Sequence, residues 1–194
     1  MTTANTTTLE SPAHRRLAPL SGSAVLFLDV DGVLNKVGTR ERSPHGTYGI
    51  EQGMVKLLRD IVAATDCKIC VSSTWRKYPD LMKHLCDELG LEARIIGKTP
   101  VLDRQMDSGI WVGKVRGDEI QAWLDEHPEV TRFVILDDDS DMAHLMPHLV
   151  LTHGCEGLTP EISSDVIRRL NVEASEPPPR GVASTESANG GSLR

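Results

Sequence analysis

The sequence predicts an α/β fold in which a doubly wound parallel sheet is covered by helices on both faces, giving three layers. Short, continuous apolar segments alternate along the chain with segments that repeat apolar residues at helical spacing. Strands with no polar alternation are typical of parallel sheets that are buried on both sides. Aromatic residues make up only 4 % of the chain, so the core is expected to be aliphatic.

Five apolar segments are expected to form the strands of this sheet. The first is 24–28, which contains no polar residue and runs directly into an aspartate. The others are 68–71, 94–96, 132–136 and 149–151. Each is short and bounded by polar or turn-forming residues, as strands are.

Three segments between these strands are expected to be helices. Apolar residues recur at helical spacing in 54–64. Segment 79–89 has Pro79 in its first turn and Gly90 just past its end, which are the favoured places for both residues. Segment 118–126 begins with acidic residues, which interact favourably with the positive end of a helix dipole.

The 194 residues are expected to form one domain with a polar segment at each end. The domain is predicted to cover 21–172. Residues 1–20 are rich in Thr, Ser and Pro and are expected to be flexible. Residues 173–194 have a composition that cannot bury enough apolar surface to offset the entropy of ordering, so a disordered tail is expected.

The charge and hydropathy of the chain exclude some classes of protein. A net charge of −7 at pH 7 argues against a protein that coats nucleic acid without specificity. The beginning of the chain has no apolar core of a signal peptide, and no apolar run approaches the length of a membrane span. We therefore expect a soluble, cytoplasmic protein that does not contact membranes.

Polar clusters follow three of the expected strands. Asp29, Asp31 and Asn35 follow the first, SSTWR (72–76) follows the second, and DDDSD (137–141) follows the fourth. In open parallel sheets, ligands bind beyond the carboxyl ends of the strands, so these clusters are expected to meet at one edge. Clustered carboxylates repel one another unless a cation binds them, and Mg²⁺ prefers oxygen ligands. The sequence therefore predicts a magnesium site there.

The spacing of the first two aspartates has a physical reason. In an extended chain, residues two apart point the same way, so Asp29 and Asp31 would face the site while Val30 enters the core. One carboxylate can then act as ligand and nucleophile and the other as acid or base. Gly32 allows the chain to turn sharply and to approach a ligand closely.

These motifs resemble those of the haloacid dehalogenase-like (HAD) phosphohydrolases. VLFLDVDGVLN (25–35), SSTWR and VILDDDSD (134–141) are similar to the first, second and fourth motifs of that superfamily, in the same order. More narrowly, DVDGVLN, SSTWR, an Arg before the EIQAWL helix, ILDDDSDM and a late GLT are similar to the HAD domain attached to bacterial RNA-repair proteins. The resemblance implies a Rossmann-like phosphatase fold.

The resemblance also implies catalytic roles. Asp29 lies where the family has its nucleophile, which becomes an aspartyl-phosphate. Asp31 lies at the position of the general acid and base. Ser72 best matches the hydroxyl of the second motif, with Ser73 as the competing candidate.

The implied magnesium ligands are the Asp29 carboxylate, the Asp31 main-chain carbonyl and the acidic pair Asp137 and Asp138. Asp138 is the favoured ligand of that pair, and Asp141 is a weaker candidate.

A basic residue is needed to neutralise the charge of the transferred phosphate. Arg116 opens the helix that usually carries it in the family, and Lys114 and Lys98 are the alternatives. The predicted substrate-binding residues around the site are Ser73, Thr74, Arg76 and Lys114.

The chain is too short to hold a large cap domain. Residues 36–53 and 97–115 are the only sizeable insertions, and neither could fold as a cap. An open site admits the end of a macromolecule, and its loops are basic: Lys36, Arg40, Arg42, Arg76, Lys77, Arg104, Lys114 and Arg116. The favoured substrate is therefore a phosphomonoester at a nucleic-acid terminus.

Three other functions are compatible with the sequence. The first is a small-molecule phosphatase of the nucleotidase type. The second is a non-catalytic, receiver-like module, which would also carry clustered aspartates, a hydroxyl and a basic residue. The third is a substrate-binding relative without turnover. The order of the motifs and the presence of both Asp29 and Asp31 disfavour the last two. The sequence predicts no oligomeric state.

Overall fold

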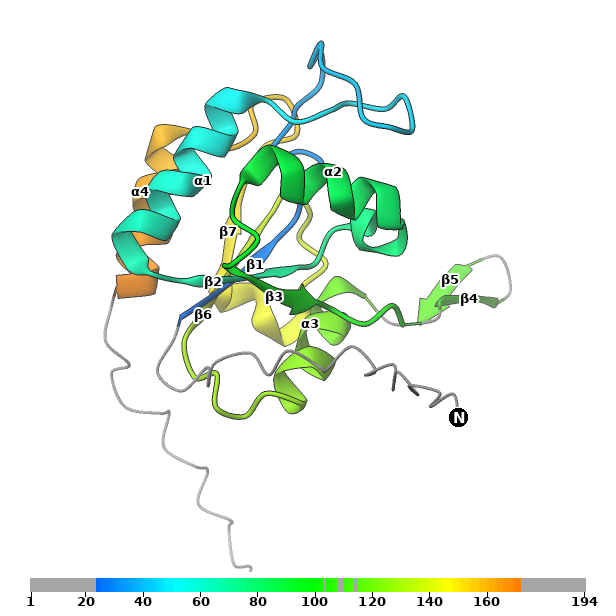
Figure 1. Cartoon of the computed structure of the whole chain (residues 1–194). Helices are drawn as coiled ribbons and strands as arrows, with labels where there is room; N and C mark the ends of the chain where they lie inside the picture. Colours follow the sequence, from blue (N-terminus) through cyan, green and yellow to red (C-terminus); the bar gives the residue numbers. More distant parts are fainter. Residues whose placement is uncertain (1–23, 103, 108–109, 114, 172–194) are drawn as a thin grey trace, which may run out of the picture.

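A five-stranded, all-parallel sheet forms the centre of the molecule (Figure 1), which confirms the predicted fold class. The strand order is β3-β2-β1-β6-β7. The strands are β1 (Val25–Leu28), β2 (Lys68–Val71), β3 (Ile95–Lys98), β6 (Phe133–Asp137) and β7 (Leu149–Leu151). All five correspond to predicted strands, with ends that differ by at most two residues.

The computed structural model describes residues 24–102, 104–107, 110–113 and 115–171. The segments 1–20 and 173–194, which were expected to be flexible or disordered, lie outside the described residues. Lys114 lies outside them as well.

The register of the three middle strands brings the polar clusters together. Leu28 in β1 pairs with Val71 in β2 and with Leu136 in β6. The three strands therefore end level with one another. Asp29, Ser72 and Asp137 follow those paired positions directly, so they emerge side by side at the carboxyl edge of the sheet.

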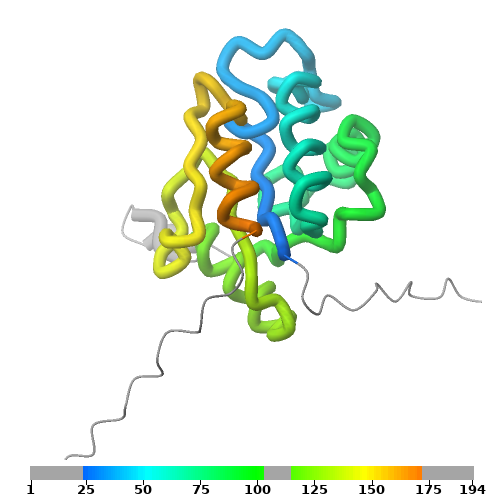
Figure 2. The backbone as a smooth tube through the Cα atoms, turned by 90° about the vertical axis from the view of Figure 1, so that its left-hand side faces the viewer, coloured from blue at the N-terminus to red at the C-terminus, as the bar shows by residue number. Residues whose placement is uncertain are grey.

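One face of the sheet packs against three helices. These are α1 (Gln52–Thr65), α2 (Pro79–Leu89) and α4 (Pro160–Asn171). Side chains from α1, α2 and α4 form one buried cluster with Leu26 and Leu28 of β1. Figure 2 shows α1 and α4 side by side on this face. Val30 is buried in the same cluster, as predicted.

The other face packs against α3 (Arg116–Asp125) and the 3₁₀ helix η2 (Ala143–His148). Here the core is not purely aliphatic. The Phe27 ring contacts Trp123 edge to face at 5.3 Å and Phe133 at 5.7 Å between ring centroids. Phe27, Trp123 and Phe133 thus form an aromatic cluster on the side of the sheet that carries α3.

We predicted neither the antiparallel hairpin of β4 (Arg104–Asp107) and β5 (Ile110–Gly113) nor the 3₁₀ helices η1 (Thr74–Lys77) and η2. We also did not predict α4, whose sequence carries clear signals. Thr159 accepts a hydrogen bond from the main-chain N–H of Ile162, and Pro160 occupies the first helical position.

Small insertions take the place of a cap domain in the described part of the chain. An isolated antiparallel β-bridge joins Arg42 and Tyr48 within the 36–51 loop. The loop also contacts α2, where His45 Nε2 lies 2.8 Å from Asp80 Oδ2. The β4–β5 hairpin is a separate two-stranded sheet that lies beyond β3 (Figure 1). Within the described residues, neither insertion folds into a domain of its own.

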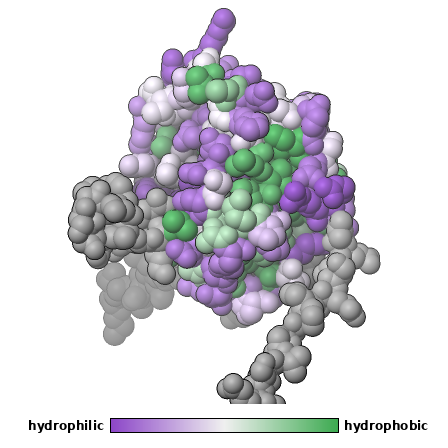
Figure 3. All heavy atoms as spheres, turned by 180° about the vertical axis from the view of Figure 1, so that it is seen from behind, coloured by the Kyte–Doolittle hydropathy of each residue, from purple (hydrophilic) through white to green (hydrophobic). Residues whose placement is uncertain are grey.

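Two further observations concern the hydropathy of the helices and of the surface. Among the described residues, no helix combines the length and the apolar character that a membrane span requires. Seen from behind, apolar residues gather on one part of the face and hydrophilic residues surround them (Figure 3).

Candidate active site

Three carboxylates converge at the carboxyl edge of the sheet. Oxygens of Asp29, Asp137 and Asp138 lie within 4.8 Å of one another. Asp29 and Asp137 are buried, whereas Asp138 is exposed. The structure thus brings together the predicted nucleophile and the predicted acidic pair, although they are more than 100 positions apart in the chain.

Gly32 makes room for Asp138. Its φ angle is +74°, and a Cβ atom added there would lie 2.1 Å from Asp138 Oδ2. The glycine therefore satisfies two demands, because it adopts a left-handed backbone and leaves space for the carboxylate. The close partner of Gly32 is a side chain of the site itself.

Arg116 places its guanidinium among the acidic groups. Its Nη1 lies 3.1 Å from Asp29 Oδ1 and 3.4 Å from Asp137 Oδ2, and it also donates to the Ser72 main-chain oxygen. Asp141 fixes the main chain of Arg116, because its Oδ2 accepts a hydrogen bond from the Arg116 main-chain N–H at 3.2 Å. Of the three candidates for the phosphate-neutralising residue, the structure places Arg116 beside Asp29.

Two other candidates lie elsewhere. Lys98 Nζ donates to the main-chain oxygen of Arg76 at 2.9 Å. Asp141 supports the start of α3 and is not part of the three-carboxylate cluster.

Asp31 is held from two sides. Its Oδ2 accepts a hydrogen bond from Trp75 Nε1 at 3.0 Å, and its Oδ1 accepts one from Asn35 Nδ2 at 2.9 Å. Asn35 also accepts the main-chain N–H of Gly32 through its side-chain oxygen. The exposed carboxylate of the predicted acid and base is therefore fixed in orientation.

The two serines of the second motif have different surroundings. The Ser73 hydroxyl accepts the Trp75 main-chain N–H and hydrogen-bonds the Asp29 carboxyl group. The Ser72 hydroxyl is buried and has no hydrogen-bond partner among the described residues. The structure therefore favours Ser73 over Ser72 as the hydroxyl that contacts the nucleophile, which reverses the expected order.

The prediction that Arg76 binds substrate gains no support from the surroundings of this side chain. Its side chain is only 1 % exposed and forms an ion pair with Glu119 Oε2 at 2.5 Å. The guanidinium also donates to the main-chain oxygens of four residues, Ser72, Ser73, Thr99 and Pro100. Arg76 is therefore a structural residue that ties the end of β2 to α3 and to the chain after β3.

This arrangement of motifs is characteristic of one family. Residues 25–162 match the sequence profile of the HAD domain in Swiss Army Knife RNA repair proteins. The chain belongs to this family. The match covers every strand of the central sheet and all of the strand-end clusters of this HAD domain. No curated protein was found to match the chain.

Burial raises the pKa values of all three clustered carboxyl groups of this HAD domain. For Asp29, burial outweighs the lowering effects of Arg116 and Ser73. For Asp137, burial and then the charge of Asp29 raise the pKa to about 7. Burial is also the main cause of the raised pKa of Asp138. When all three groups are ionised, they carry three negative charges against the one positive charge of Arg116.

Arg116 stays protonated in this setting. Burial alone would lower the pKa of its guanidinium, but the charges of Asp29 and Asp137 outweigh burial and raise it. A fixed positive charge next to the predicted nucleophile can pair with two phosphate oxygens in a planar, bidentate way.

Sequence reasoning missed several residues that shape the site of this HAD domain. Trp75, which belongs to the SSTWR cluster, orients Asp31 through its indole N–H. Glu119 neutralises Arg76. Thr152 donates its hydroxyl to the Gly32 main-chain oxygen at 2.8 Å and so fixes the turn after β1. These pairings join positions 43 to 120 residues apart, and nothing in the local sequence signals them.

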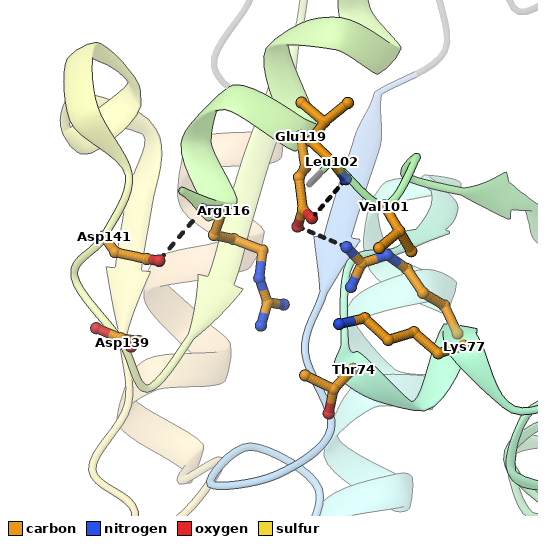
Figure 4. A pocket seen from close by; sticks show the side chains of 9 residues that line it. Thr74, Lys77, Val101, Leu102, Arg116, Glu119, Asp139 and Asp141 are labelled. Atoms are coloured by element: carbon orange, nitrogen blue, oxygen red, sulfur yellow. Dashed lines mark hydrogen bonds and ion pairs between the residues drawn. The ribbon is translucent and has the colours of Figure 1, made fainter. Parts of the chain in front are cut away.

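A pocket of about 460 Å³ opens next to Arg116 (Figure 4). Thr74, an expected substrate-binding residue, is exposed and lies on its wall. A second hollow of about 330 Å³ lies on the other side of the carboxylates, between Asp31, Asp138 and the 36–51 loop. Both hollows are open, so the site can be approached from two directions.

Proposed function

We propose that this HAD domain is a Mg²⁺-dependent phosphatase that hydrolyses a phosphomonoester through an aspartyl-phosphate at Asp29. The observation that carries the proposal is the position of Asp29. It ends the central strand, lies 3.1 Å from Arg116 and belongs to the three-carboxylate cluster. A nucleophile, a neutralising cation and a metal-binding group are what phosphoryl transfer requires of a protein.

The residues of the site fit a magnesium ion. Asp137 Oδ2 is buried and has no hydrogen-bond partner among the described residues. The carboxyl groups of Asp29 and Asp138 lie beside it, so a cation bound there would lie close to all three. All the available donors are oxygens, which Mg²⁺ prefers. Asp29, Asp138 and the Asp31 carbonyl would hold the ion, with Asp137 close by. When bound, it would offset the repulsion among the carboxylates and neutralise charge on the phosphate.

Asp29 and Arg116 share the first half of the reaction. The Asp29 carboxylate attacks phosphorus, and the bond between phosphorus and the leaving oxygen breaks. Arg116 pairs with the phosphoryl oxygens as charge moves onto them, which is an electrostatic contribution that costs no reorganisation. The hydrogen bond from Ser73 keeps the attacking carboxylate in place.

Asp31 moves the proton in both halves. Its protonated form donates to the leaving oxygen, which departs as an alcohol. The resulting carboxylate then accepts a proton from the water that attacks the phosphorus of the aspartyl-phosphate, releasing inorganic phosphate and regenerating Asp29. Trp75 and Asn35 hold Asp31 in one orientation for both transfers.

The proposed substrate is a terminal phosphate of RNA. The family of this HAD domain is named for RNA repair proteins. Two open hollows flank the carboxylates, so a polymer end can enter without a cap having to move. A small nucleotide is the second candidate, because either hollow has the volume of a small-molecule site.

Phosphate release from a panel of substrates tests the proposal. The panel holds RNA and DNA oligonucleotides with 3′- or 5′-phosphates, and mononucleotides. We expect turnover with Mg²⁺, none in EDTA, and no rescue by Ca²⁺, whose larger and looser coordination misplaces the nucleophile. Asp29→Asn should be folded and inactive. Turnover in EDTA, or in Asp29→Asn, would contradict the mechanism. Faster turnover of mononucleotides than of RNA ends would favour the second candidate.

A further inference from the structure

The pocket beside Arg116 is larger than a single phosphate group requires. Its volume of about 460 Å³ lies in the range of sites that hold whole small molecules, roughly 300–1,000 Å³. Arg116 reaches it from α3, and Thr74 and Lys77 reach it from η1. The pocket therefore has room for a part of the substrate beyond the phosphate that Asp29 attacks.

The described cationic side chains around this pocket differ in whether a carboxylate pairs with them. Arg76 is paired with Glu119, and Arg116 is paired with Asp29 and Asp137. Lys77 is exposed, and no carboxylate in the described part of the chain forms an ion pair with it. Within that part of the chain, Lys77 is thus a cation whose charge no ion pair balances.

Figure 4 shows how Lys77 is aimed. Its amino group points into the pocket towards the Arg116 guanidinium on the opposite wall, and the Thr74 side chain lies nearby on the same side as Lys77. Asp139 and Asp141 lie on the Arg116 side. A second anionic group would therefore be attracted to the Lys77 side and repelled from the other.

We propose that Lys77 and Thr74 bind a second phosphate of the substrate, adjacent to the one that is hydrolysed. This inference rests on the proposed function, because it takes the phosphate near Asp29 and Arg116 as the scissile one. The second phosphate accepts a charge-assisted hydrogen bond from Lys77 and a hydrogen bond from the Thr74 hydroxyl. The sugar between the two phosphates fills the pocket, whose wall includes the half-exposed apolar side chain of Val101.

A second phosphate can come from an internal phosphodiester of RNA or from a small bisphosphate. Three ligands separate these sources. Uridine 3′-monophosphate has one phosphate, uridine 3′,5′-bisphosphate has two, and the dinucleotide UpUp has a terminal phosphate and a phosphodiester. Binding to the full-length Asp29→Asn variant is measured by calorimetry with Mg²⁺, so the readout needs no turnover.

We expect both two-phosphate ligands to bind more tightly than the monophosphate by about tenfold or more, the range for a hydrogen bond to a charged group. Adding Lys77→Met, which keeps the length of the side chain but removes the charge, should abolish this advantage. Lys77→Arg should restore most of it. Lys83→Met is the matched control, because Lys83 lies exposed on α2 and is paired with Asp87.

Each outcome bears on the subsite. An advantage that Lys77→Met leaves intact, or equal affinities for all three ligands, would overturn it. A gain for the bisphosphate without a gain for UpUp would support the subsite and assign it to small bisphosphates. If the wild-type protein hydrolyses nothing in the panel while the Lys77-dependent affinity persists, the proposed function fails and the subsite stands.

Discussion

At the scale of single residues, the site depends on close approaches that only particular side chains allow. Gly32 and Asp138 are the clearest example, because the carboxylate lies where a Cβ atom of residue 32 would be. Asp138 is the favoured magnesium ligand, so this contact links a backbone turn to metal binding. A substitution at Gly32 therefore tests the site without removing any of its functional groups.

We predict that Gly32→Ala loses nearly all turnover and most Mg²⁺ affinity. The left-handed backbone alone should cost about 1–2 kcal/mol of unfolding free energy. The added methyl group would also displace the Asp138 carboxylate. Thermal unfolding with and without Mg²⁺, together with phosphate release, measures both effects.

Gly46→Ala is the matched control for this prediction. Gly46 has a φ angle of +78°, close to that of Gly32, and a Cβ atom there would meet nothing within 4 Å. This variant should lose similar stability but keep its Mg²⁺ response. If both variants lose turnover to the same degree, backbone strain rather than the contact with Asp138 is responsible.

Trp75→Phe should lower kcat by about tenfold while keeping the fold. General acid–base catalysis accelerates a reaction by about 10²–10⁴-fold, and this variant loses only one of the two hydrogen bonds that orient Asp31. The phenyl ring keeps most of the buried packing of Trp75 but cannot donate to Asp31. A pH profile of kcat measures the effect. Trp123→Phe is the control and should leave that profile unchanged, because Trp123 belongs to α3 and its ring packs in the core against the sheet.

The residues that the sequence could identify are those at strand ends. Asp29 and Asp138 could be found because parallel strands end at a common edge, so apolar runs that stop at acidic residues point to one place. The buried pairing of Arg76 could not be found. Its neighbours in sequence are hydroxyls, which suggested substrate binding, whereas its partner Glu119 lies 43 positions away.

At the scale of elements, the buried pair of Arg76 and Glu119 connects η1 to α3. Arg76 is the largest buried polar side chain, and Glu119 Oε1 also accepts the Leu102 main-chain N–H at 3.2 Å. The pair therefore fixes the chain after β3 and the start of the β4–β5 insertion relative to the site. Its contribution to function is to hold the walls of the pocket in place.

Arg76→Ala and Glu119→Ala should each lower the free energy of unfolding by about 3–5 kcal/mol, because each leaves a buried charge without its partner. The double variant should lose less than the sum, as expected for residues in contact. Urea unfolding measures these values. At temperatures where it remains folded, Arg76→Ala should slow hydrolysis of an oligonucleotide and of a small ester to the same extent. A selective loss on the oligonucleotide would show that Arg76 touches substrate after all.

The element η2 gives a prediction about pH. Burial against Phe133, whose ring stacks on the imidazole at 4.1 Å, lowers the pKa of His148 below its ordinary 6.5, and the charges of Arg169 and His144 lower it further. A hydrogen bond involving the Phe133 backbone opposes this shift. Because the folded state binds the proton less readily, stability is fully present above pH 6.5 and decreases as the pH falls below it.

His148→Phe should therefore reduce the loss of melting temperature between pH 7.5 and pH 5.5. The effect should be small, since His148 is partly exposed and solvent screens its charge. His153→Phe, for which no equivalent stacking on an aromatic ring is found in the described structure, is the control. An equal loss in the wild-type protein and in His148→Phe would contradict the prediction.

Most elements of the sheet and its helices could be predicted because apolar periodicity marks them directly. The β4–β5 hairpin could not, since the residues from Arg104 to Gly113 carry no regular alternation of apolar and polar residues. The helix α4 could have been predicted. Ile162, Val166 and Leu170 recur at intervals of four residues and pack against the core.

At the scale of the whole molecule, the absence of a cap layer over the described carboxyl edge shapes the proposed specificity. Enclosure of the substrate by a second domain is replaced by two open hollows and a fixed cluster of charges. Discrimination between substrates must then come from groups around the rim, such as Lys77. The proposed chemistry, in contrast, depends on Asp29, which lies at the centre of the sheet edge.

Chemical trapping of the enzyme during turnover tests this mechanism most directly. A phosphorylated RNA oligonucleotide is mixed with the protein and Mg²⁺, and the reaction is quenched and treated with borohydride, which reduces an aspartyl-phosphate to homoserine. Peptide mass spectrometry then locates the change. The proposed mechanism predicts homoserine at position 29 only, and none without substrate. Phosphate release with an unmodified Asp29, or with homoserine at another aspartate, would contradict it.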